Sequence, residues 1–357
     1  MGVFSPNSTA GYEGSGRRVI VAISGGVDSS VAAMILKSKG FHVTGVILKI
    51  WEGFSSRDAE SVADFLDIPY HIIDVTDYFR NEIVNYFIDE YTNGRTPNPC
   101  VKCNSDIKFR YLLDIKRELK ADYIATGHYA RTSFDSVRDR FLLKKALDDT
   151  KDQSYVLHRL TQHTLSFSLF PLGDLSKNQV RRAASEANIP VADKSESQEI
   201  CFLSGSSYRD FLRTRNNSMI RPGPILDTEG NIIGEHCGLP FYTIGQRKGL
   251  DLRGPEKLYV VKIDVVNNSI IVGEKKDLLS GTLKARGINW IAYRTPPPEI
   301  RLGIKIRYNA KEVPGLLIRK NQDMVDVLFD EPQRAVTPGQ FVVFYEGDVV
   351  VGGGTIV

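Results

Sequence analysis

Apolar residues recur at two different spacings along this chain. In residues 17–201, short β-branched runs such as RVIVAI at 18–23 are followed by stretches in which apolar residues have helical spacing. One such stretch, 29–40, ends at Gly40, and glycine commonly stops a helix. Strands that alternate with helices are typical of a parallel sheet covered by helices on both faces. We therefore predict a doubly wound α/β fold for this region.

The remaining elements follow from the same patterns. Within the α/β region we expect a helix and three further strands, at 57–66 and at 41–51, 70–75 and 121–126. Beyond residue 201, glycine and proline become frequent and helical spacing fades. There we expect two strands that meet at Asn267 and Asn268, and later strands at 302–308, 324–329, 340–345 and 348–357. Short strands at this spacing indicate a small C-terminal β-barrel.

These changes of pattern divide the chain into four parts. We expect a flexible tail at 1–16, the α/β domain at 17–205, a small central domain at 206–278 and the β-barrel at 279–357. A length of 357 residues is sufficient for two or three domains, each with its own core.

Composition places the protein among globular proteins of a reducing compartment. Charged residues make up 25% and hydrophobic residues 42% of the chain, which excludes wholesale disorder. No apolar run approaches the roughly 18 residues of a membrane span. Four cysteines are too few for a secreted disulfide scaffold, so we expect a cytoplasmic protein with no membrane contact.

Charge alone says little about partners, because the net charge is only +3. Two local clusters are basic: six Lys or Arg within 301–320, and four Arg within 209–221. Each cluster could face phosphate groups or could be a solvated surface.

The sharpest motif lies between the first predicted strand and the first predicted helix, and reads Ser24-Gly25-Gly26-Val27-Asp28-Ser29-Ser30. Glycine lets backbone N–H groups approach phosphate oxygens, and a helix N-terminus adds free amides. No Gly-Lys-Ser/Thr follows, so this loop differs from that of γ-phosphate-transferring enzymes. It resembles the PP-loop of ATP pyrophosphatases, in which a nucleophile attacks the α-phosphate and pyrophosphate leaves.

That resemblance implies ATP and Mg²⁺ as cofactors. Asp28 would help hold the magnesium ion. The residues implied to line the nucleotide are Ala22, Ile23, Ser24, Gly25, Gly26, Val27, Asp28, Ser29, Leu48 and Gly127.

Several further motifs occur in a fixed order along the chain. They are TPNPCVKCN at 96–104 with IKF at 107–109, ATGHYAR at 125–131, KDQSY at 151–155, SQEICF at 197–202, TIGQRKGL at 243–250 and PGQ at 338–340. Together they resemble the tRNA-specific 2-thiouridylase (MnmA) family over nearly the whole chain after residue 17. The resemblance implies an ATP-dependent transferase that replaces the 2-oxygen of a tRNA uridine with sulfur.

Two cysteines would carry the sulfur chemistry in such an enzyme. Cys103 matches the family's nucleophile, and Cys201 matches the cysteine that receives a persulfide from a sulfur-relay donor protein. The persulfide could attack the adenylated uridine directly, or Cys103 could first release hydrosulfide; the sequence leaves both routes open. Thiolates at these positions would be favoured by a nearby Lys102, Lys108 or Lys194.

Cys100 departs from the family pattern, in which many members have an aspartate proposed as proton acceptor. Its thiol could take over acid–base work, or it could compete as a disulfide partner of Cys103. A zinc site is the other interpretation of Cys-x-x-Cys, but no second paired spacing supplies the remaining ligands, so we expect no structural metal. We expect Cys237 to be a small buried residue.

The resemblance also implies contacts with tRNA, with the lysine, glutamate and glutamine tRNAs as expected substrates. The implied contact residues are Lys151, Asp152, Gln153, Arg307, Tyr308, His128 and Gln340. Two alternatives remain: another PP-loop enzyme that uses an amine nucleophile, and a nucleotide-binding regulator without catalytic activity.

Overall fold

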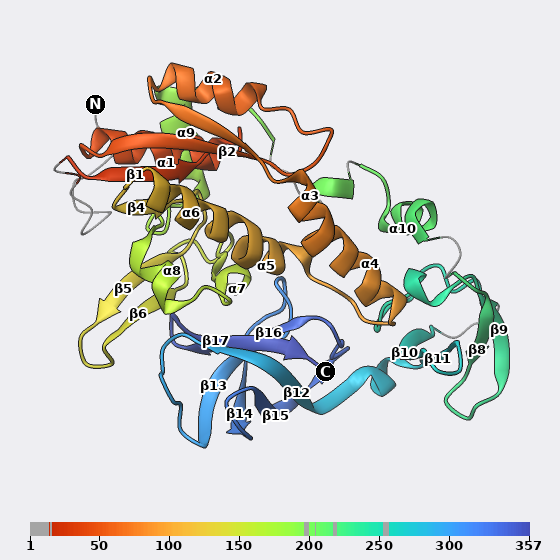
Figure 1. Ribbon diagram of the computed structural model, residues 1–357. Helices are drawn as coiled ribbons and strands as arrows, with labels where there is room; N and C mark the ends of the chain where they lie inside the picture. The colour runs from red at the N-terminus through yellow and green to blue at the C-terminus, as the bar shows by residue number, and fades with distance from the viewer. Residues whose placement is uncertain (1–13, 15, 196–199, 204, 217–219, 253–256) are drawn as a thin grey trace.

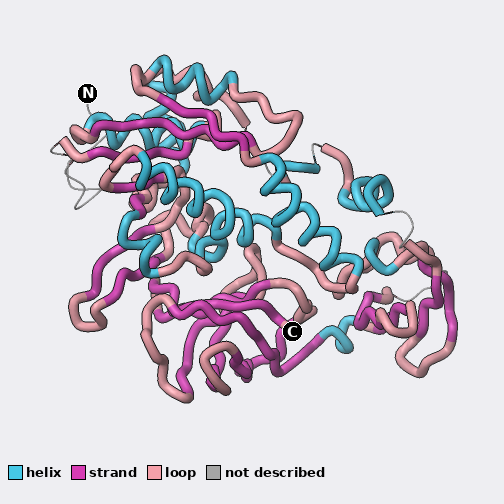
Figure 2. The backbone as a smooth tube through the Cα atoms, viewed as in Figure 1, coloured by secondary structure: helices cyan, strands magenta, loops and turns pink. Residues whose placement is uncertain are grey.

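The structure is a computed structural model, and it describes residues 14, 16–195, 200–203, 205–216, 220–252 and 257–357. Most of the tail expected at 1–16 therefore lies outside the described residues. Three parts are visible in Figure 1: an α/β part, a small central part and a C-terminal barrel. Helices gather in the first part, and strands dominate the other two (Figure 2).

The α/β part is built on a five-stranded parallel sheet, which confirms the predicted fold class. Its strand order is β3-β2-β1-β4-β7. The strands are β1 (Arg18–Ala22), β2 (His42–Lys49), β3 (Tyr70–Asp74), β4 (Tyr123–Ala125) and β7 (Ser168–Leu169).

Helices cover both faces of this sheet because successive residues of β1 point to opposite sides. Val19 and Val21 pack with apolar residues of α1 (Val27–Ser38), α2 (Arg57–Phe65) and α9 (Lys177–Glu186). Ile20 packs on the other face with α6 (Arg110–Glu118) and α8 (Gln162–Phe167). On both faces of the sheet the side chains of β1 are excluded from solvent, since Val19, Ile20 and Val21 are each at most 1% exposed.

Two longer helical runs change their winding partway along. The first consists of α3 (Thr76–Phe79), the π-helical segment η1 (Arg80–Val84) and α4 (Asn85–Thr92). The second consists of α5 (Pro99–Cys103), the π-helical segment η2 (Asn104–Phe109) and α6. π-Helical turns are rare and occur often at functional sites, and η2 begins directly after Cys103.

The central part contains a four-stranded sheet of order β10-β11-β8-β9. Its elements are α10 (Tyr208–Asn216), β8 (Gly223–Leu226), β9 (Ile232–His236), η5 (Leu239–Phe241), β10 (Tyr259–Asp264), β11 (Ser269–Gly273) and η6 (Lys275–Leu278). The predicted turn at Asn267 and Asn268 is confirmed, and Asn268 adopts a φ of 47° there. Helix α10 was not expected from the fading helical pattern.

The C-terminal part is a closed antiparallel barrel, as predicted. Its strands run in the order β12-β15-β14-β13-β16-β17, and β17 pairs back with β12. They are β12 (Leu279–Trp290), β13 (Glu299–Lys305), β14 (Val313–Arg319), β15 (Met324–Arg334), β16 (Phe341–Glu346) and β17 (Val349–Ile356). Closure leaves the barrel without an open edge between β12 and β17.

The α/β part and the barrel are fastened together by a hairpin that the sequence patterns did not predict. It consists of β5 (Arg131–Asp135) and β6 (Arg140–Lys144), and Lys144 pairs with Val349 of the barrel strand β17. From β6, the Arg140 guanidinium donates to the carbonyl oxygens of Ile291 and Trp290 at 2.6 and 2.9 Å. One apolar cluster also contains residues from both parts, so this interface is both polar and apolar.

Replacing Leu36 of α1 by alanine should destabilise the α/β part by about 2–5 kcal/mol, because its fully buried side chain would leave a cavity. Urea unfolding followed by circular dichroism measures this change in the free energy of unfolding. Leu147→Ala is the matched control, since that side chain is 65% exposed and should cost less than about 0.5 kcal/mol. Equal losses in the two variants would contradict the described packing.

Candidate active site

The predicted phosphate loop lies at the carboxyl end of β1 and leads directly into α1, which begins at Val27. Gly25 has a φ of +70°, and a Cβ there would lie 2.8 Å from Cβ of Asp58, so only glycine fits. The Ser29 hydroxyl accepts from the Ser24 amide at 3.1 Å and lies 3.1 Å from the Gly26 carbonyl oxygen, to which it donates. No side chain caps the start of α1. The loop is thus pre-shaped, with an uncapped helix end available for an anion.

Gly127, at the end of β4, closes the other side of this loop. A Cβ on Gly127 would lie 2.6 Å from the Ser29 amide nitrogen and 2.7 Å from the Asp28 carbonyl carbon. Leu48 lies near the end of the adjacent strand β2. The fold therefore brings the predicted nucleotide-lining residues of three strand ends to one edge of the sheet, the usual ligand position in such folds.

Lys177 is a residue of this site that sequence analysis missed. Its ammonium donates to both carboxylate oxygens of Asp28, at 2.6 and 2.8 Å, and the Tyr129 hydroxyl donates to the same carboxylate at 2.8 Å. Lys177 is the first residue of α9 and is only 8% exposed. This buried ammonium compensates the charge of Asp28 and fixes the orientation of its carboxylate beside the phosphate loop. Lys177 lies in none of the motifs identified in the sequence, so nothing in the sequence indicated its contact with Asp28.

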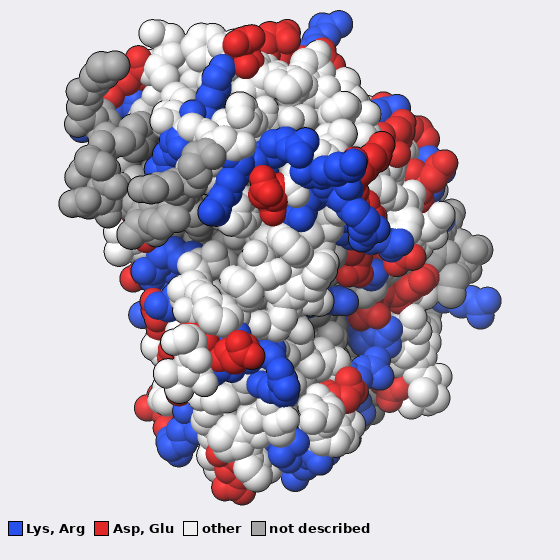
Figure 3. All heavy atoms as spheres, turned by 60° about the vertical axis from the view of Figure 1, so that its left-hand side comes forward, with Lys and Arg blue, Asp and Glu red and all other residues white. Residues whose placement is uncertain are grey.

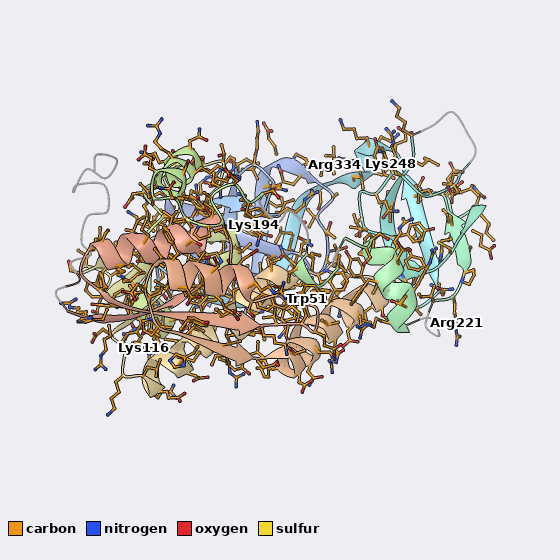
Figure 4. All side chains as sticks on the ribbon, turned by 90° about the horizontal axis from the view of Figure 1, so that it is seen from above. Trp51, Lys116, Lys194, Arg221, Lys248 and Arg334 are labelled. Carbon is orange, nitrogen blue, oxygen red and sulfur yellow. The ribbon has the colours of Figure 1, made fainter. Side chains whose placement is uncertain are left out.

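Lys194 also reaches the phosphate loop, where its ammonium donates to the Gly25 carbonyl oxygen at 3.0 Å and pairs with Asp58. Our suggestion that Lys194 favours the cysteine thiolates is therefore wrong. Trp51, at the end of β2, and Lys194 both lie toward the middle of the molecule in Figure 4. The Lys102 suggestion is also not supported, because the Lys102 ammonium is neutralised by Glu82 and Asp106 at 3.0 and 2.7 Å.

The second group of predicted residues is a cluster of cysteines around Lys108. Cys100 and Cys103 lie on helix α5, which is capped by the Asn98 side chain, and Cys201 begins the short 3-10 helix η3 (Cys201–Leu203). Cys103 is 7% exposed within an apolar cluster, whereas Cys100 and Cys201 are accessible to solvent. All described cysteines are in the thiol form, with no disulfide.

Cys103 packs in one apolar cluster with Ile107, which precedes Lys108, and with Phe202, which follows Cys201. Burial raises the pKa of the Cys103 thiol to about 12; the Lys108 ammonium opposes this shift, and the charges of Cys201 and Cys100 add to it. Cys201 and Cys100 reach the surface, but the protein around their thiols still removes part of the surrounding water and so raises the pKa of both, again opposed by Lys108. Lys108 is therefore the cation that favours the thiolates, and among the described residues it has no ion-pair partner of its own.

His128 lies beside the same lysine. Burial lowers the pKa of its imidazole to about 3, and the Lys108 charge lowers it further, so this ring is neutral at physiological pH. Its Nδ1 lies 2.7 Å from the Thr126 hydroxyl, and the ring stacks on Phe109 with centroids 6.0 Å apart. A neutral, oriented imidazole can accept or donate one hydrogen bond to a polar group without adding charge.

A hollow of about 550 Å³ opens at Phe202, the residue after Cys201. Its wall includes Phe202, Trp51 and two arginines, Arg80 of η1 and Arg215 of α10. Residues 197–199 of the SQEICF motif lie outside the described residues. Within the part of the chain that the structure describes, no three His, Cys, Asp or Glu side chains are grouped so as to hold a metal ion.

The residues implied to contact tRNA differ in how free they are to do so. Asp152 is 8% exposed, and its carboxylate accepts from the Ala146 amide at 3.0 Å and from the Ser154 hydroxyl at 2.8 Å. The Gln153 side chain accepts from the Tyr129 amide at 2.9 Å. These two residues of the 151–155 motif therefore shape the loop from inside, and Lys151 is the half-buried member beside them.

The barrel residues of that set are also engaged with the protein. Arg307 donates to the Arg334 carbonyl oxygen at 2.5 Å, and the Tyr308 ring lies 6.0 Å from the Tyr155 ring. The Gln340 amide donates to the carbonyl oxygens of Thr96 and Pro97. One expectation is wrong: Cys237 is exposed, not buried, with its sulfur 3.6 Å from the Tyr242 hydroxyl.

Outside this site, Lys and Arg side chains form a band across the upper half of the face shown in Figure 3, where the α/β part lies. Helix α6 contributes exposed basic residues to the surface of this part, namely Arg110 and Arg117, and Lys120 follows its end. Such a band favours a polyanionic partner. No helix among the described residues has the length and apolarity needed to cross a membrane.

The pH dependence of alkylation tests the cysteine environment. Only thiolate reacts with iodoacetamide, so Cys103, with a pKa near 12, should react much more slowly at pH 8 than the accessible Cys100 and Cys201. Its rate should rise about tenfold per pH unit between about pH 7 and pH 9. Mass spectrometry of tryptic peptides measures each rate.

Lys108→Met should slow alkylation of Cys103 further, because removing the nearby positive charge raises the thiol pKa. Lys102→Met is the matched control, since its charge is already compensated by two carboxylates, and should leave the rate within about twofold. Equal slowing by both substitutions would refute the special position of Lys108.

Comparison with known proteins agrees with this geometry along the whole described chain. Residues 17–205 match the profile described as tRNA methyl transferase HUP domain, residues 209–274 the tRNA methyl transferase PRC-barrel domain, and residues 280–356 the aminomethyltransferase beta-barrel domain. The tRNA-specific 2-thiouridylase MnmA 1 of Caldanaerobacter subterraneus subsp. tengcongensis is 49% identical over 354 residues, covering 95% of this chain and 97% of that protein. The tRNA-specific 2-thiouridylase MnmA of Moorella thermoacetica is 48% identical and covers 94% and 98%. With three profiles in order and relatives of this identity over nearly its full length, the chain belongs to the tRNA-specific 2-thiouridylase (MnmA) family.

Proposed function

We propose that this protein is an ATP-dependent tRNA-uridine 2-sulfurtransferase. ATP adenylates the 2-oxygen of the wobble uridine, and sulfur from a cysteine persulfide replaces that oxygen, giving 2-thiouridine, AMP and pyrophosphate. The observation that carries the proposal is that Cys103 shares an apolar cluster with Phe202, the residue after Cys201, although Cys201 lies ninety-eight residues beyond Cys103 in the sequence. The Lys108 charge acts on both thiols. Relatives named tRNA-specific 2-thiouridylase support the same reaction.

The phosphate loop supplies the nucleotide site in this proposal. Backbone amides of the loop and the start of α1 would bind the β- and γ-phosphates, and Lys177 would hold the Asp28 carboxylate beside them. Asp28 fits as a magnesium ligand, because a carboxylate has about four acceptor positions and its bonds to Lys177 and Tyr129 leave one for the ion or its water. Bound magnesium would offset the charge of the departing pyrophosphate.

The sulfur chemistry follows from the cysteine cluster. The uridine 2-oxygen attacks the α-phosphorus and pyrophosphate leaves. The outer sulfur of the Cys201 persulfide then adds at C2, AMP leaves with the oxygen, and Cys103 thiolate attacks the Cys201 sulfur to release 2-thiouridine. Alternatively, Cys103 first attacks the persulfide and frees hydrosulfide, which adds at C2. Both routes end in a Cys103–Cys201 disulfide that a thiol reductant must reduce by two electrons.

Cys100 is a poor proton acceptor in this structure, because burial raises its pKa and keeps it a thiol near neutral pH. His128 is neutral there and lies beside the same lysine, so it can hold a hydrogen bond to the uridine or to a water at the site. We therefore assign His128 to the reacting nucleotide and leave Cys100 as a third thiol of the cluster.

The partners follow from the substrates. We assign nucleotide binding and catalysis to residues 17–205, and tRNA binding to the central part at 206–278 and the barrel at 279–357. Wobble uridines of the lysine, glutamate and glutamine tRNAs are the proposed targets, contacted by Lys151, Arg307 and Tyr308. A sulfur-relay protein would deliver the persulfide to Cys201, whose exposure permits access. We propose that an enzyme acting on these tRNAs works in the cytoplasm.

Transfer of labelled sulfur from a persulfide donor into unmodified tRNA, with ATP and magnesium, tests this function. Cys103→Ser and Cys201→Ser should each lower the rate by more than about a hundredfold, because a hydroxyl neither carries a persulfide nor forms the disulfide. Cys237→Ser, an exposed thiol outside the cluster, is the matched control and should leave the rate within about twofold. Pyrophosphate release without sulfur incorporation would instead favour a PP-loop enzyme with an amine nucleophile.

Gly127→Ala tests the nucleotide site separately. A methyl group 2.6 Å from the Ser29 amide must displace the phosphate loop, so the Kd for ATP should rise about tenfold or more, equivalent to roughly 1.4 kcal/mol. Gly281→Ala is the matched control, because no atom lies within 4 Å of its added Cβ. Isothermal titration calorimetry with a non-hydrolysable ATP analogue gives both constants. Unchanged ATP binding in Gly127→Ala would place the nucleotide elsewhere.

A further inference from the structure

Both other parts of the molecule contact the short segment 94–97, which lies directly before the cysteine-bearing helix α5. From the barrel, the Pro338 carbonyl oxygen accepts from the Thr96 amide at 2.9 Å. The Gln340 side-chain amide donates to the carbonyl oxygens of Thr96 and Pro97 at 3.0 and 3.3 Å. In Figure 1 the connection from α4 to α5 passes where the three parts of the molecule come together.

The barrel side of this contact is closely fitted and well supported. Gly339 has a φ of +88°, and a Cβ there would lie 2.9 Å from Cβ of Arg95 and 3.0 Å from the Thr96 amide nitrogen. The turn at 338–340 is fixed to the last strand, because the Gly339 amide donates to the Ile356 carbonyl oxygen at 3.0 Å and the Ile356 amide donates to that of Gln340 at 2.8 Å. Gln340 therefore reaches the segment from a rigid base.

The central part touches the same segment from another side. The hydroxyls of Thr96 and Thr243 are 3.2 Å apart. Gly94 has a φ of +66°, and a Cβ there would lie 2.8 Å from Cγ2 of Val265 and 2.9 Å from Cγ2 of Ile263. Elsewhere the central part and the barrel also meet, at Arg334 over the Tyr259 ring, 5.0 Å from its centroid (Figure 4 labels Arg334). Thr96 is thus a junction of all three parts.

If Thr96 moved, helix α5 and its two cysteines would move with it, because the backbone between them is stiff. Only Pro97 and Asn98 separate Thr96 from the first residue of α5, and the prolines at 97 and 99 restrict the backbone between them. Both prolines are buried, and Asn98 caps α5 by accepting from the Val101 amide at 3.4 Å. The start of α5, and with it Cys100 and Cys103, is therefore placed by what holds Thr96.

We propose that Gln340 is a positioning residue that acts through Thr96 and Pro97: its two hydrogen bonds set where helix α5 holds Cys103 relative to Cys201. The inference rests on the proposed sulfur chemistry for its consequence, but the contact itself needs neither tRNA nor ATP. It gives Gln340 a role on the protein side, in addition to the tRNA contact expected from the sequence. The barrel is fastened elsewhere by β6 and a shared apolar cluster, so loss of these two bonds should spare its docking.

Gln340→Glu is the test, because glutamate keeps the size of the side chain but presents a carboxylate without a donor to two carbonyl oxygens. Diamide oxidation without tRNA or ATP, followed by mass spectrometry, measures the rate of Cys103–Cys201 disulfide formation. We expect that rate, and the single-turnover rate of sulfur transfer, to fall about tenfold or more, equivalent to roughly 1.4 kcal/mol. The Tm should change little, because the barrel is fastened elsewhere.

Gln333→Glu is the matched control, since its amide also donates to a barrel carbonyl oxygen, that of Glu331 at 2.8 Å, but reaches no other part. It should leave every rate unchanged. Thr96→Val is the second variant, and it should slow disulfide formation in the same direction by removing the hydroxyl contact to Thr243. If Gln340→Glu lowers the Tm strongly, Gln340→Met decides, because it removes both donated bonds without adding a charge and should slow disulfide formation in the same direction.

Two outcomes would overturn the inference. A weaker tRNA Kd with an unchanged disulfide rate would leave Gln340 with the tRNA contact alone. No effect of Gln340→Glu and Thr96→Val on the disulfide rate would remove the junction's role. Failure of the proposed function is distinguishable, because in that case wild-type protein would not incorporate sulfur, whatever the diamide rates of the variants.

Discussion

The apolar layer that buries Cys103 is the packing on which the candidate site depends. It combines side chains of the α3–α4 run, of η2, of η3 and of the central sheet in one cluster. Phe202, next to Cys201, packs edge-on against Phe79 and Phe87, with ring centroids 5.8 and 5.2 Å apart. This aromatic contact fixes the backbone next to Cys201. The burial of Phe202 therefore also determines where Cys201 lies.

The burial of Cys103 also has an electrostatic cost, because it raises the pKa of the thiol. Removing a thiol from water disfavours its thiolate, yet the attack on a persulfide and the final disulfide that we propose both need that thiolate. Lys108 partly offsets the cost for three cysteines at once, and it lowers the pKa of His128 by the same charge. One cation therefore favours sulfur anions and a neutral imidazole together, which suits a site that must keep sulfur nucleophilic without charging its neighbour.

The α/β part, the central part and the barrel are in direct contact with one another around this site. The hairpin of β5 and β6 carries the sheet of the barrel into the α/β part, and the Tyr155 hydroxyl donates to the Phe341 carbonyl oxygen at 2.8 Å across the same boundary. These contacts hold the barrel on the α/β part without involving Thr96. The contacts at Thr96 can therefore determine the position of helix α5 more than the stability of the domain interface. Domain docking and cysteine geometry are then linked through short, stiff backbone, and no large movement is required.

How much of this the sequence could predict depends on how local each feature is. The first strand, the phosphate loop and the barrel strands follow from neighbouring residues, because alternation and glycine act within a few positions. Lys177 could not be predicted as a partner of Asp28, since the contact depends on how α9 packs against α1 and joins residues 149 positions apart. The sequence also could not show that Lys108, and not Lys102 or Lys194, is the lysine that favours the cysteine thiolates. In an α-helix a residue five positions beyond Cys103 points away from it, whereas the π-helical turn of η2 brings such residues toward one side. A local change of winding, with no clear mark in the sequence, thus decides which lysine faces the cysteines.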